Sequence, residues 1–144
     1  MAFCERLSEQ LAVVATIDPQ AGVTATPVTS DVVSMVLHRR ALFIFSKGAG
    51  SAGVLVNIQE ATAGFAAGTA TILTRAATAT MQPNTQYLFE VTSEALALGN
   101  TALRAILTPA QDDLISVVCL ADVERYHPAS DYDLPSVVSI QVAN

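Results

Sequence analysis

Alternating hydrophobic and polar positions divide most of this chain into short segments with the two-residue period of a β-strand. The central stretch, Ala41–Glu60, holds two of them. Leu42–Phe45 is apolar at every position, as in a strand covered on both faces, and Val54–Ile58 alternates. The connection between them, Lys47–Gly53, is rich in glycine and other small residues, which is typical of a chain reversal. The two segments therefore predict a β-hairpin.

Further strand-like segments follow this hairpin. Gln86–Thr92 shows the most regular alternation, Thr101–Leu107 alternates as well, and Leu114–Ala121 is a second continuous apolar run. A short helix is expected at Ser93–Leu98, where Gly99 would end it. Together with weaker segments, these patterns predict about eight or nine strands separated by turn residues. Helical patterns long enough for β-α-β units are absent from the sequence, so we expect an all-β fold: an antiparallel β-sandwich or barrel-like domain of about eight short strands.

The N-terminal residues follow a different pattern. Spacings of four, four and three residues separate the apolar positions of a helical stripe, Phe3, Leu7, Leu11 and Val14. The overlapping segment Ala12–Ile17 fits a strand equally well. We expect residues 1–18 to form a short N-terminal helix or arm and the first strand. This arm packs either on its own domain or on a neighbouring subunit.

From Asp122 onward the sequence is acidic and irregular until the β-branched run Val137–Ile140. Two tyrosines and Leu134 would be poor choices for a solvated tail. We therefore expect residues 122–144 to form an extended C-terminal arm that lies on another surface. Residues 19–121 then make up the β domain between the two arms.

Composition narrows the class of protein. The 144 residues suffice for one domain with a substantial core. Hydrophobic residues make up 51% of the chain and charged residues only 14%, which favours a protein that hides surface in an oligomer. The net charge of −6 and the scattered basic residues argue against nucleic acid as a partner. No stretch approaches the ~20 apolar residues of a membrane span, and charges within positions 5–9 argue against a secretory signal.

Residue types that carry catalysis are sparse. The two histidines, His38 and His127, lie outside any Gly-x-Ser-x-Gly motif, and we expect His38 to be an exposed turn residue. Cys4 and Cys119 lack the Cys-x-x-Cys spacing of a zinc site, and we expect unpaired thiols. The chain has no Trp, which sugar-binding clefts commonly use. We therefore expect no enzyme, no catalytic residue, no metal and no cofactor.

Acidic residues cluster at two places. Asp112–Asp113 is expected to form a solvated turn. Asp131 and Asp133 share the spacing that opens a calcium loop, but the glycine and the twelfth-position glutamate are missing. A hydrogen-bonded turn is therefore favoured there over a weak calcium site.

Five fragments, spread in order over most of the chain, together resemble a family of small virion proteins of tailed bacteriophages and prophages. The C-terminal fragment, ERYxPASDYDL, is the most specific of them. The fragments are Ala15–Pro19, Ser30–Met35, Arg40–Ile44, Val56–Thr62 and Glu124–Leu134.

The resemblance implies a non-enzymatic, structural role. Members of this family are typically encoded beside the major capsid protein, and some such neighbours act as capsid cement or decoration proteins. The implied partners are the major capsid protein and further copies of the same chain, arranged as a homotrimer on the outer surface of the capsid. The protein would be made in the host cytoplasm and become part of the virion. Its acidic charge suits the outside of a particle that is packed with polyanion.

The two arms are the segments that we expect to contact these partners. The expected contact residues are Phe3, Leu7, Leu11, Arg125, Tyr126, Asp131, Tyr132, Leu134, Val138 and Ile140. Two other interpretations stay open. A neck or tail adaptor, or a baseplate β module, would share the composition and the oligomeric habit. A carbohydrate- or receptor-binding domain on the virion surface would need exposed aromatic residues, and only 6% of this chain is aromatic.

Overall fold

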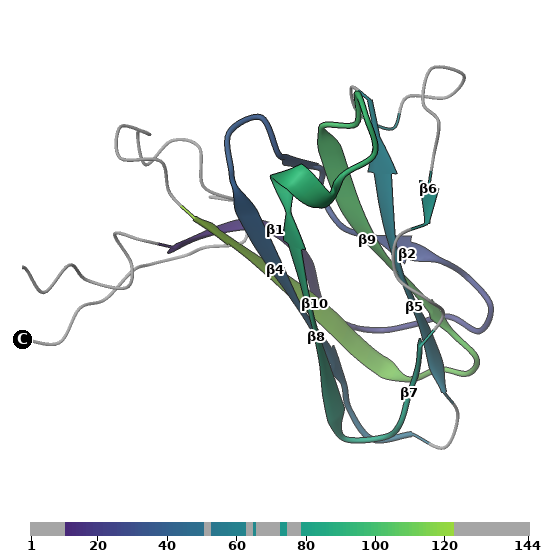
Figure 1. The fold of residues 1–144 in the computed structure, drawn as a ribbon. Coiled ribbons are helices and arrows are strands. Elements are labelled where there is room, and N and C mark those ends of the chain that lie inside the picture. Colours follow the sequence, from purple (N-terminus) through teal and green to yellow (C-terminus); the bar gives the residue numbers. More distant parts are fainter. Residues whose placement is uncertain (1–10, 51–52, 63–64, 66–72, 75–78, 123–144) are drawn as a thin grey trace, which may run out of the picture.

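A computed structural model describes residues 11–50, 53–62, 65, 73–74 and 79–122, which form two β-sheets packed face to face (Figure 1). The strands are β1 (Leu11–Ala21), β2 (Val28–Thr29), β3 (Val33–Ser34), β4 (Arg40–Lys47), β5 (Val54–Ala61), β6 (Leu73–Thr74), β7 (Ala79–Met81), β8 (Thr85–Thr92), β9 (Ala102–Pro109) and β10 (Leu114–Asp122). The one helix among these residues is the short 3-10 helix η1 (Ser93–Ala95). No helix in this part of the chain has the length and apolar character needed to cross a membrane.

The strand order identifies the type of sandwich. Sheet A has the order β1-β10-β4-β8, and sheet B has the order β2-β9-β5-β6, with β3 also paired to β9 and β7 to β5. All of these pairs are antiparallel. β2 and β3 can be taken as one interrupted edge strand of sheet B, and β6 and β7 as the other. Each sheet then has four strands, and their connectivity is that of a double-sheet jelly roll. The predicted all-β, antiparallel fold is confirmed, and of the two expected forms, a sandwich or a barrel-like domain, the structure shows the sandwich.

The hydrophobic core lies between the inner faces of the two sheets. Its fully buried side chains include Phe43, Phe45 and Val117 from sheet A and Val56, Ile58, Leu103 and Leu107 from sheet B. The rings of Phe43 and Phe45 stack with their centroids 6.2 Å apart. Cys119 lies in the same core as a free cysteine, as expected. Burial raises the pKa of its thiol, so this group stays protonated and unreactive.

The predicted hairpin between the two central strands is wrong. β4 pairs with β10 and β8 in sheet A, whereas β5 pairs with β9 in sheet B. Each strand buries one face only: Phe43 and Phe45 are inaccessible, while Leu42 and Ile44 stay half-buried on the outer face. Two such faces bury the most apolar surface when they oppose each other across a core. The glycine-rich connection therefore carries the chain from one sheet to the other.

The expected helical stripe near the N-terminus is wrong from Leu11 onward, because Leu11 begins strand β1. A shift in register against β10 between Val13 and Ala15 marks a β-bulge. The extra residue lets Ala12 and Ala15 both face the core although they are three positions apart. This spacing also occurs along one face of a helix, which is why the sequence pattern misleads. The expected helix at Ser93–Leu98 is reduced to the three residues of η1.

Candidate functional site: the loop end and the outer face of sheet A

One end of the sandwich is built from three neighbouring segments: the β3–β4 connection, η1 and the η1–β9 connection. A hydrogen bond from Met35 N to Thr101 O (2.7 Å) joins the first segment to the third. A second bond, from Ser93 N to Arg39 O (2.8 Å), joins the first segment to η1. We call this end of the molecule the loop end. Its position follows from the strand directions, since β4 begins here and β8 ends here.

Large apolar side chains are exposed at the loop end. Val36 is 68% exposed and Leu98 is fully exposed, and Leu37 is exposed to a smaller degree. Single exposed apolar residues are common, but three on loops at one end of the molecule offer apolar surface whose burial by a partner would gain free energy. Loops held by a rigid scaffold are also where binding residues concentrate. The loop end is therefore a candidate binding surface.

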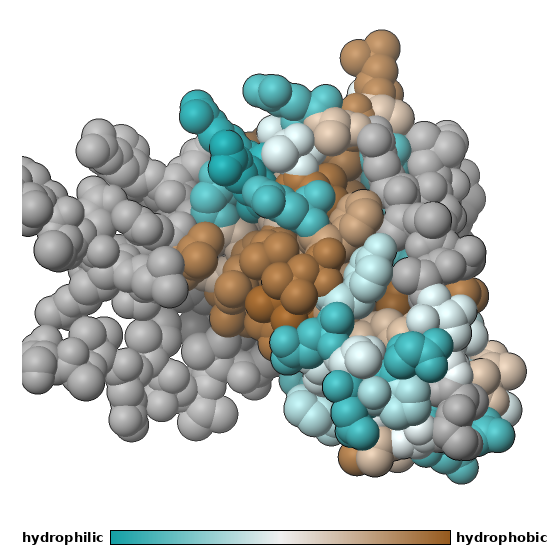
Figure 2. All heavy atoms as spheres, turned by 60° about the horizontal axis from the view of Figure 1, so that its bottom comes forward, coloured by the Kyte–Doolittle hydropathy of each residue, from teal (hydrophilic) through white to brown (hydrophobic). Residues whose placement is uncertain are grey.

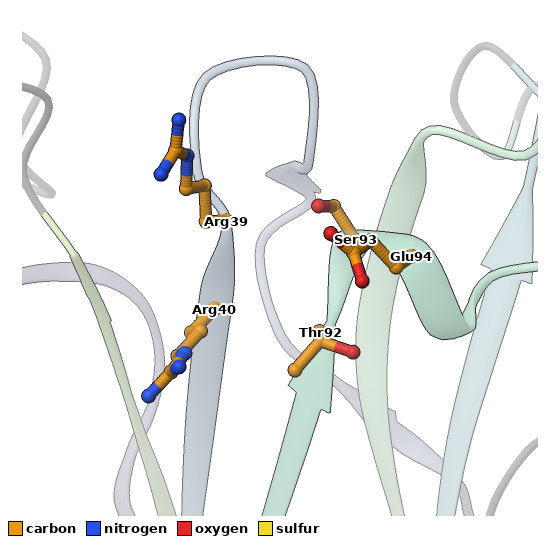
Figure 3. A pocket seen from close by; sticks show the side chains of 5 residues that line it. All are labelled: Arg39, Arg40, Thr92, Ser93 and Glu94. Atoms are coloured by element: carbon orange, nitrogen blue, oxygen red, sulfur yellow. The ribbon is translucent and has the colours of Figure 1, made fainter.

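A polar pocket of 360 Å³ lies beside these residues, lined by Arg39, Arg40, Thr92, Ser93 and Glu94. Figure 3 shows the two guanidinium groups pointing away from Ser93 and Glu94. The positive charges therefore lie on the β4 side of the pocket, and the hydroxyl groups and the carboxylate lie on the other side. Such a lining can hold charged groups of a partner. None of the described residues that line the pocket is a histidine or cysteine that could act with the hydroxyls in nucleophilic catalysis. Within the described ranges, no group of three or more His, Cys, Asp or Glu residues could hold a metal ion.

Asp122, the last residue of β10, holds the start of β4 in place. Its Oδ1 accepts hydrogen bonds from the main-chain N–H groups of Arg39 (2.9 Å) and Arg40 (3.0 Å). Its main-chain oxygen lies 2.7 Å from Nδ1 of His38, which is only 9% exposed. The expectation of an exposed His38 is therefore wrong, because the ring packs and bonds where β10 ends. These contacts place both arginines beside the point at which residues 123–144 begin.

We expect Asp122→Ala to loosen the start of β4 while the core stays intact. Losing two hydrogen bonds at a partly exposed site should lower the free energy of unfolding by about 1 kcal/mol, measured by urea denaturation. Hydrogen exchange at the amides of Arg39 and Arg40 should speed up. Asp122→Asn keeps an oxygen acceptor, so its free energy of unfolding should fall by less than that of Asp122→Ala. Equal losses in the two variants would contradict the role given to Oδ1.

The outer face of sheet A carries apolar side chains in register across three strands. Val118 of β10 lies opposite Ile44 of β4, which lies opposite Leu88 of β8, and Leu120 and Leu42 form a second pair beside them. We call these five residues the outer row. Val118 is 37% exposed and Leu88 is 59% exposed. Figure 2 shows apolar surface gathered in one area and bordered by hydrophilic residues. The solvent face of an antiparallel sheet is normally polar, so the outer row is a second candidate binding surface.

The opposite end of the sandwich holds a buried ion pair. Lys47 Nζ lies 3.2 Å from Asp113 Oδ1, and these side chains are 0% and 1% exposed. The expected solvated turn is therefore wrong for Asp113, while Asp112 is exposed and accepts a hydrogen bond from Thr24 N. The ion pair ties β4 to the β9–β10 turn, which is a structural role.

The residues predicted to bind partners lie mostly outside the described part of the chain. Leu11 is described, and it sits half-buried at the start of β1. The others lie outside the described residues: Phe3, Leu7, Arg125, Tyr126, Asp131, Tyr132, Leu134, Val138 and Ile140. The loop end was missed from the sequence. The available signal was the presence of apolar residues at turn positions, Val36–Leu37 before the polar His38 and Leu98 before Gly99.

The strand order and the two surfaces define a jelly-roll sandwich with exposed apolar surface at its loop end and on one sheet face. No protein-family model matches the sequence, and no curated protein matches it significantly. Among solved structures, the chain is similar to one in "Structure of infectious bursal disease virus Gx strain", with a TM-score of 0.41 and 11% identity over 79% of this chain. The match covers 32% of that viral chain, so this protein spans about a third of its length. A similarity at this level concerns the general arrangement of strands, and no functional argument rests on it.

Proposed function

We propose that this protein is a non-enzymatic structural component of a phage virion, a cement or decoration protein that binds the outer surface of the capsid shell as a homotrimer. The observation that carries the proposal is the apolar surface exposed by a well-packed sandwich, at the loop end and along the outer row. Surfaces of this kind are stable in water when partners cover them. Two separate surfaces allow one protomer to contact the shell and a neighbouring copy at the same time.

Fold, charge and sequence resemblance support this function. Double-sheet jelly rolls occur in viral capsid and lectin domains, although a fold alone does not decide a function. The resemblance to small phage virion proteins favours the first of these two uses. A net charge of −6 suits a protein that stays outside a particle filled with nucleic acid. The absence of Trp from the sequence disfavours a lectin, since sugar rings commonly stack on that side chain.

The loop end is the surface that we assign to the shell. Its exposed apolar side chains, Val36 and Leu98, stand on loops that a rigid sandwich presents at one end. Arg39 and Arg40 add positive charge beside them on a chain that is otherwise acidic. An apolar centre with a charged rim is the usual anatomy of a specific protein interface.

Co-sedimentation with capsid shells tests the proposed function. Purified protein would be mixed with expanded shells assembled from the phage's major capsid protein, and the pelleted amount would be measured against the concentration added. We expect saturable binding at a fixed ratio to capsid subunits, and the ratio identifies the symmetry position. Absence of binding to intact shells would refute the cement function. If the protein were nevertheless found in virions, the neck or tail component would take its place.

Acidic substitutions at the loop end should weaken binding to the shell. We expect Leu98→Asp and Val36→Asp each to reduce the affinity at least about tenfold, because a carboxylate would have to be desolvated in the interface. The matched control is Val23→Asp, since Val23 is 63% exposed in the β1–β2 connection at the opposite end. It should bind like the unaltered protein. All three variants should unfold at the same urea concentration, and an equal loss of binding in all three would place the contact elsewhere.

A further inference from the structure

The edges of the two sheets are protected to different degrees. An exposed edge strand can pair with another chain, and proteins blunt such edges with short strands, bulges, prolines and charges. Both edges of sheet B are made of short strands of two or three residues, β2 with β3 and β6 with β7. In sheet A the edge strand β1 has two register shifts, Val13/Ala15 and Ile17/Gln20, and the second contains Asp18 and Pro19. These three edges are poor templates for pairing.

β8, the other edge of sheet A, has none of these protections. All eight of its residues pair with β4 in continuous register. Its sequence, TQYLFEVT, contains no proline and no lysine, and its one charged residue is Glu90. Among the residues that the structure describes, no strand pairs with its outward side. Within the described part of the chain, β8 is therefore a long, regular edge without a neighbouring strand on its outward side, and we call it the open edge.

The main-chain groups that face outward from β8 can be identified. Ser93 N donates to Arg39 O, and these residues are directly opposite each other in the continued register of β4 and β8. Hydrogen-bonded pairs alternate with non-bonded pairs in an antiparallel ladder. The odd-numbered residues of β8 therefore bond to β4. The outward-facing N–H and C=O groups belong to the even-numbered residues, Gln86, Leu88, Glu90 and Thr92.

The side chains of β8 are incompletely covered on both faces. On the inner face, Val91 is buried, Phe89 is half-buried and Tyr87 is 36% exposed, so the core opens progressively along the strand. On the outer face, Leu88 is 59% exposed and ends the outer row. A strand added beside β8 would extend the sheet and close this opening. The side chains that cover the inner face would have to be apolar.

We propose that residues 137–142 of a second copy of this chain add one strand to sheet A by pairing with β8. The inference rests on the homo-oligomeric function proposed above, for which it names the contact between copies. In this segment Val138, Ile140 and Val142 share one strand face, and Ser139 and Gln141 share the other. With the apolar face inward, the segment covers the opening beside the inner face of β8. Its polar side chains then lie in water beside Glu90.

The intervening chain is long enough for a second copy to be the donor. β10 ends at Asp122, and β8 ends at Thr92, at the same end of sheet A. A strand added outside β8 lies three strand spacings from β10, about 15 Å. The fourteen residues 123–136 include two prolines and reach up to about 45 Å when extended. This reach is sufficient for pairing within one chain and also for crossing a small domain of about 30 Å to a second copy. The oligomeric state of the unaltered protein therefore decides between these two donors.

Charge complementarity sets the direction of the added strand. Antiparallel pairing places the start of residues 137–142 beside Thr92, at the end of sheet A where Arg39 and Arg40 lie. Asp131 and Asp133 precede this segment in the sequence and would reach the end of the acceptor copy that carries Arg39, Arg40 and Glu94. Opposite charges at this position stabilise the antiparallel arrangement over the parallel one.

Two variants test separately the edge strand β8, which accepts the added strand, and residues 137–142, which provide it. Glu90→Pro removes an outward N–H group without breaking a bond to β4, because Pro is tolerated where an edge strand faces solvent. Glu90→Ala is its control, since this variant keeps the N–H group. A chain that ends at Ser136 lacks the donor segment. In analytical ultracentrifugation the Pro variant and the shortened chain should be monomers, and the unaltered protein and Glu90→Ala should be oligomers.

Single substitutions in the donor provide a second matched pair. Ile140→Asp places a carboxylate on the face that covers the core and should give monomers. Gln141→Asp, on the opposite face, should leave the oligomer unchanged. Oligomers in both variants, or monomers in both, would overturn the assignment of the two faces.

Mixing the two monomeric variants is the decisive experiment. The Glu90→Pro chain keeps an intact donor and the shortened chain keeps an intact β8, so the mixture should form a one-to-one heterodimer. Hydrogen exchange at Leu88 should slow in that heterodimer. Absence of the heterodimer, or oligomers that persist in either variant alone, would overturn the inference.

Shell co-sedimentation of the unaltered protein is interpreted separately from the mixing experiment. Pairing through β8 without shell binding refutes only the proposed function. Shell binding without pairing refutes only this inference.

Discussion

Asp113→Ala should lower the free energy of unfolding by about 3–5 kcal/mol, because it leaves a buried ammonium group without its carboxylate. The Lys47 side chain is 0% exposed and its Nζ lies 3.2 Å from Asp113 Oδ1, so water cannot replace the lost partner in the folded state. Urea denaturation followed by circular dichroism measures the change. A loss below about 1 kcal/mol would contradict the burial of this pair.

A double variant separates the effect of losing the charges of this ion pair from the effect of losing its packing volume. Lys47→Met with Asp113→Val replaces both charges by apolar groups, which is often neutral or stabilising for a buried pair. We expect it to recover most of the stability lost in Asp113→Ala, whereas Lys47→Met alone should be strongly destabilised by the remaining carboxylate. The neighbouring Gly50 is part of the same arrangement, since a Cβ atom there would overlap Asp113 Oδ1. A double variant as unstable as the single ones would show that packing, not charge, dominates this end.

Phe43→Ala should destabilise the protein to a similar extent, by about 3–5 kcal/mol. Phe43 is fully buried in the middle of sheet A, opposite Cys119 on one side and Phe89 on the other. Its ring also stacks on Phe45. Removing it leaves a cavity between two sheets whose backbones are held by their ladders and cannot collapse freely. Urea denaturation again gives the change in the free energy of unfolding.

The adjacent residue is the matched control for this substitution. Ile44 lies one position along the same strand but points outward and is half-buried in the outer row. We expect Ile44→Ala to lower the free energy of unfolding by only about 1 kcal/mol. Equal losses in Phe43→Ala and Ile44→Ala would contradict the burial of a single face of β4.

The positions of the described surfaces are consistent with a protein that contacts two kinds of neighbour. The loop end gathers connections at one end of the sandwich, whereas the open edge of β8 runs along its side. A protomer with this arrangement could hold the shell through the first surface and a neighbouring copy through the second. Variants at Leu98 and at Glu90 would then affect shell binding and self-association separately.

Local sequence patterns predicted several elements well. The alternation in Gln86–Thr92 and Thr101–Leu107 matches β8 and β9, and the apolar run at Leu114–Ala121 matches β10. These strands are regular, so the two-residue period of their side chains is preserved along the chain. β1 was harder to recognise because its bulge breaks that period between Val13 and Ala15.

Polar residues were predicted less well than strands. His38 was expected to be exposed and Asp113 to be solvated, but each is buried beside a partner distant in sequence, Asp122 and Lys47 respectively. A charged or polar residue at a turn is exposed by default. Whether it is buried depends on which distant group completes its hydrogen bonds, and the sequence near that residue does not contain this information.

By itself, the sequence determined that this protein is antiparallel and all-β, either a sandwich or a barrel-like domain, and where its long regular strands lie. Strand periodicity and turn residues are local properties, so they can be recognised in the sequence. Only the tertiary structure decided which strands are neighbours. It placed β4 and β5 in different sheets, and among the described strands it put β8 at the edge of sheet A, where Leu88 ends the outer row. A periodic pattern shows that a strand has an apolar face, but it does not show which strand that face meets. That choice is made by burial across the whole core, which joins residues far apart in the chain.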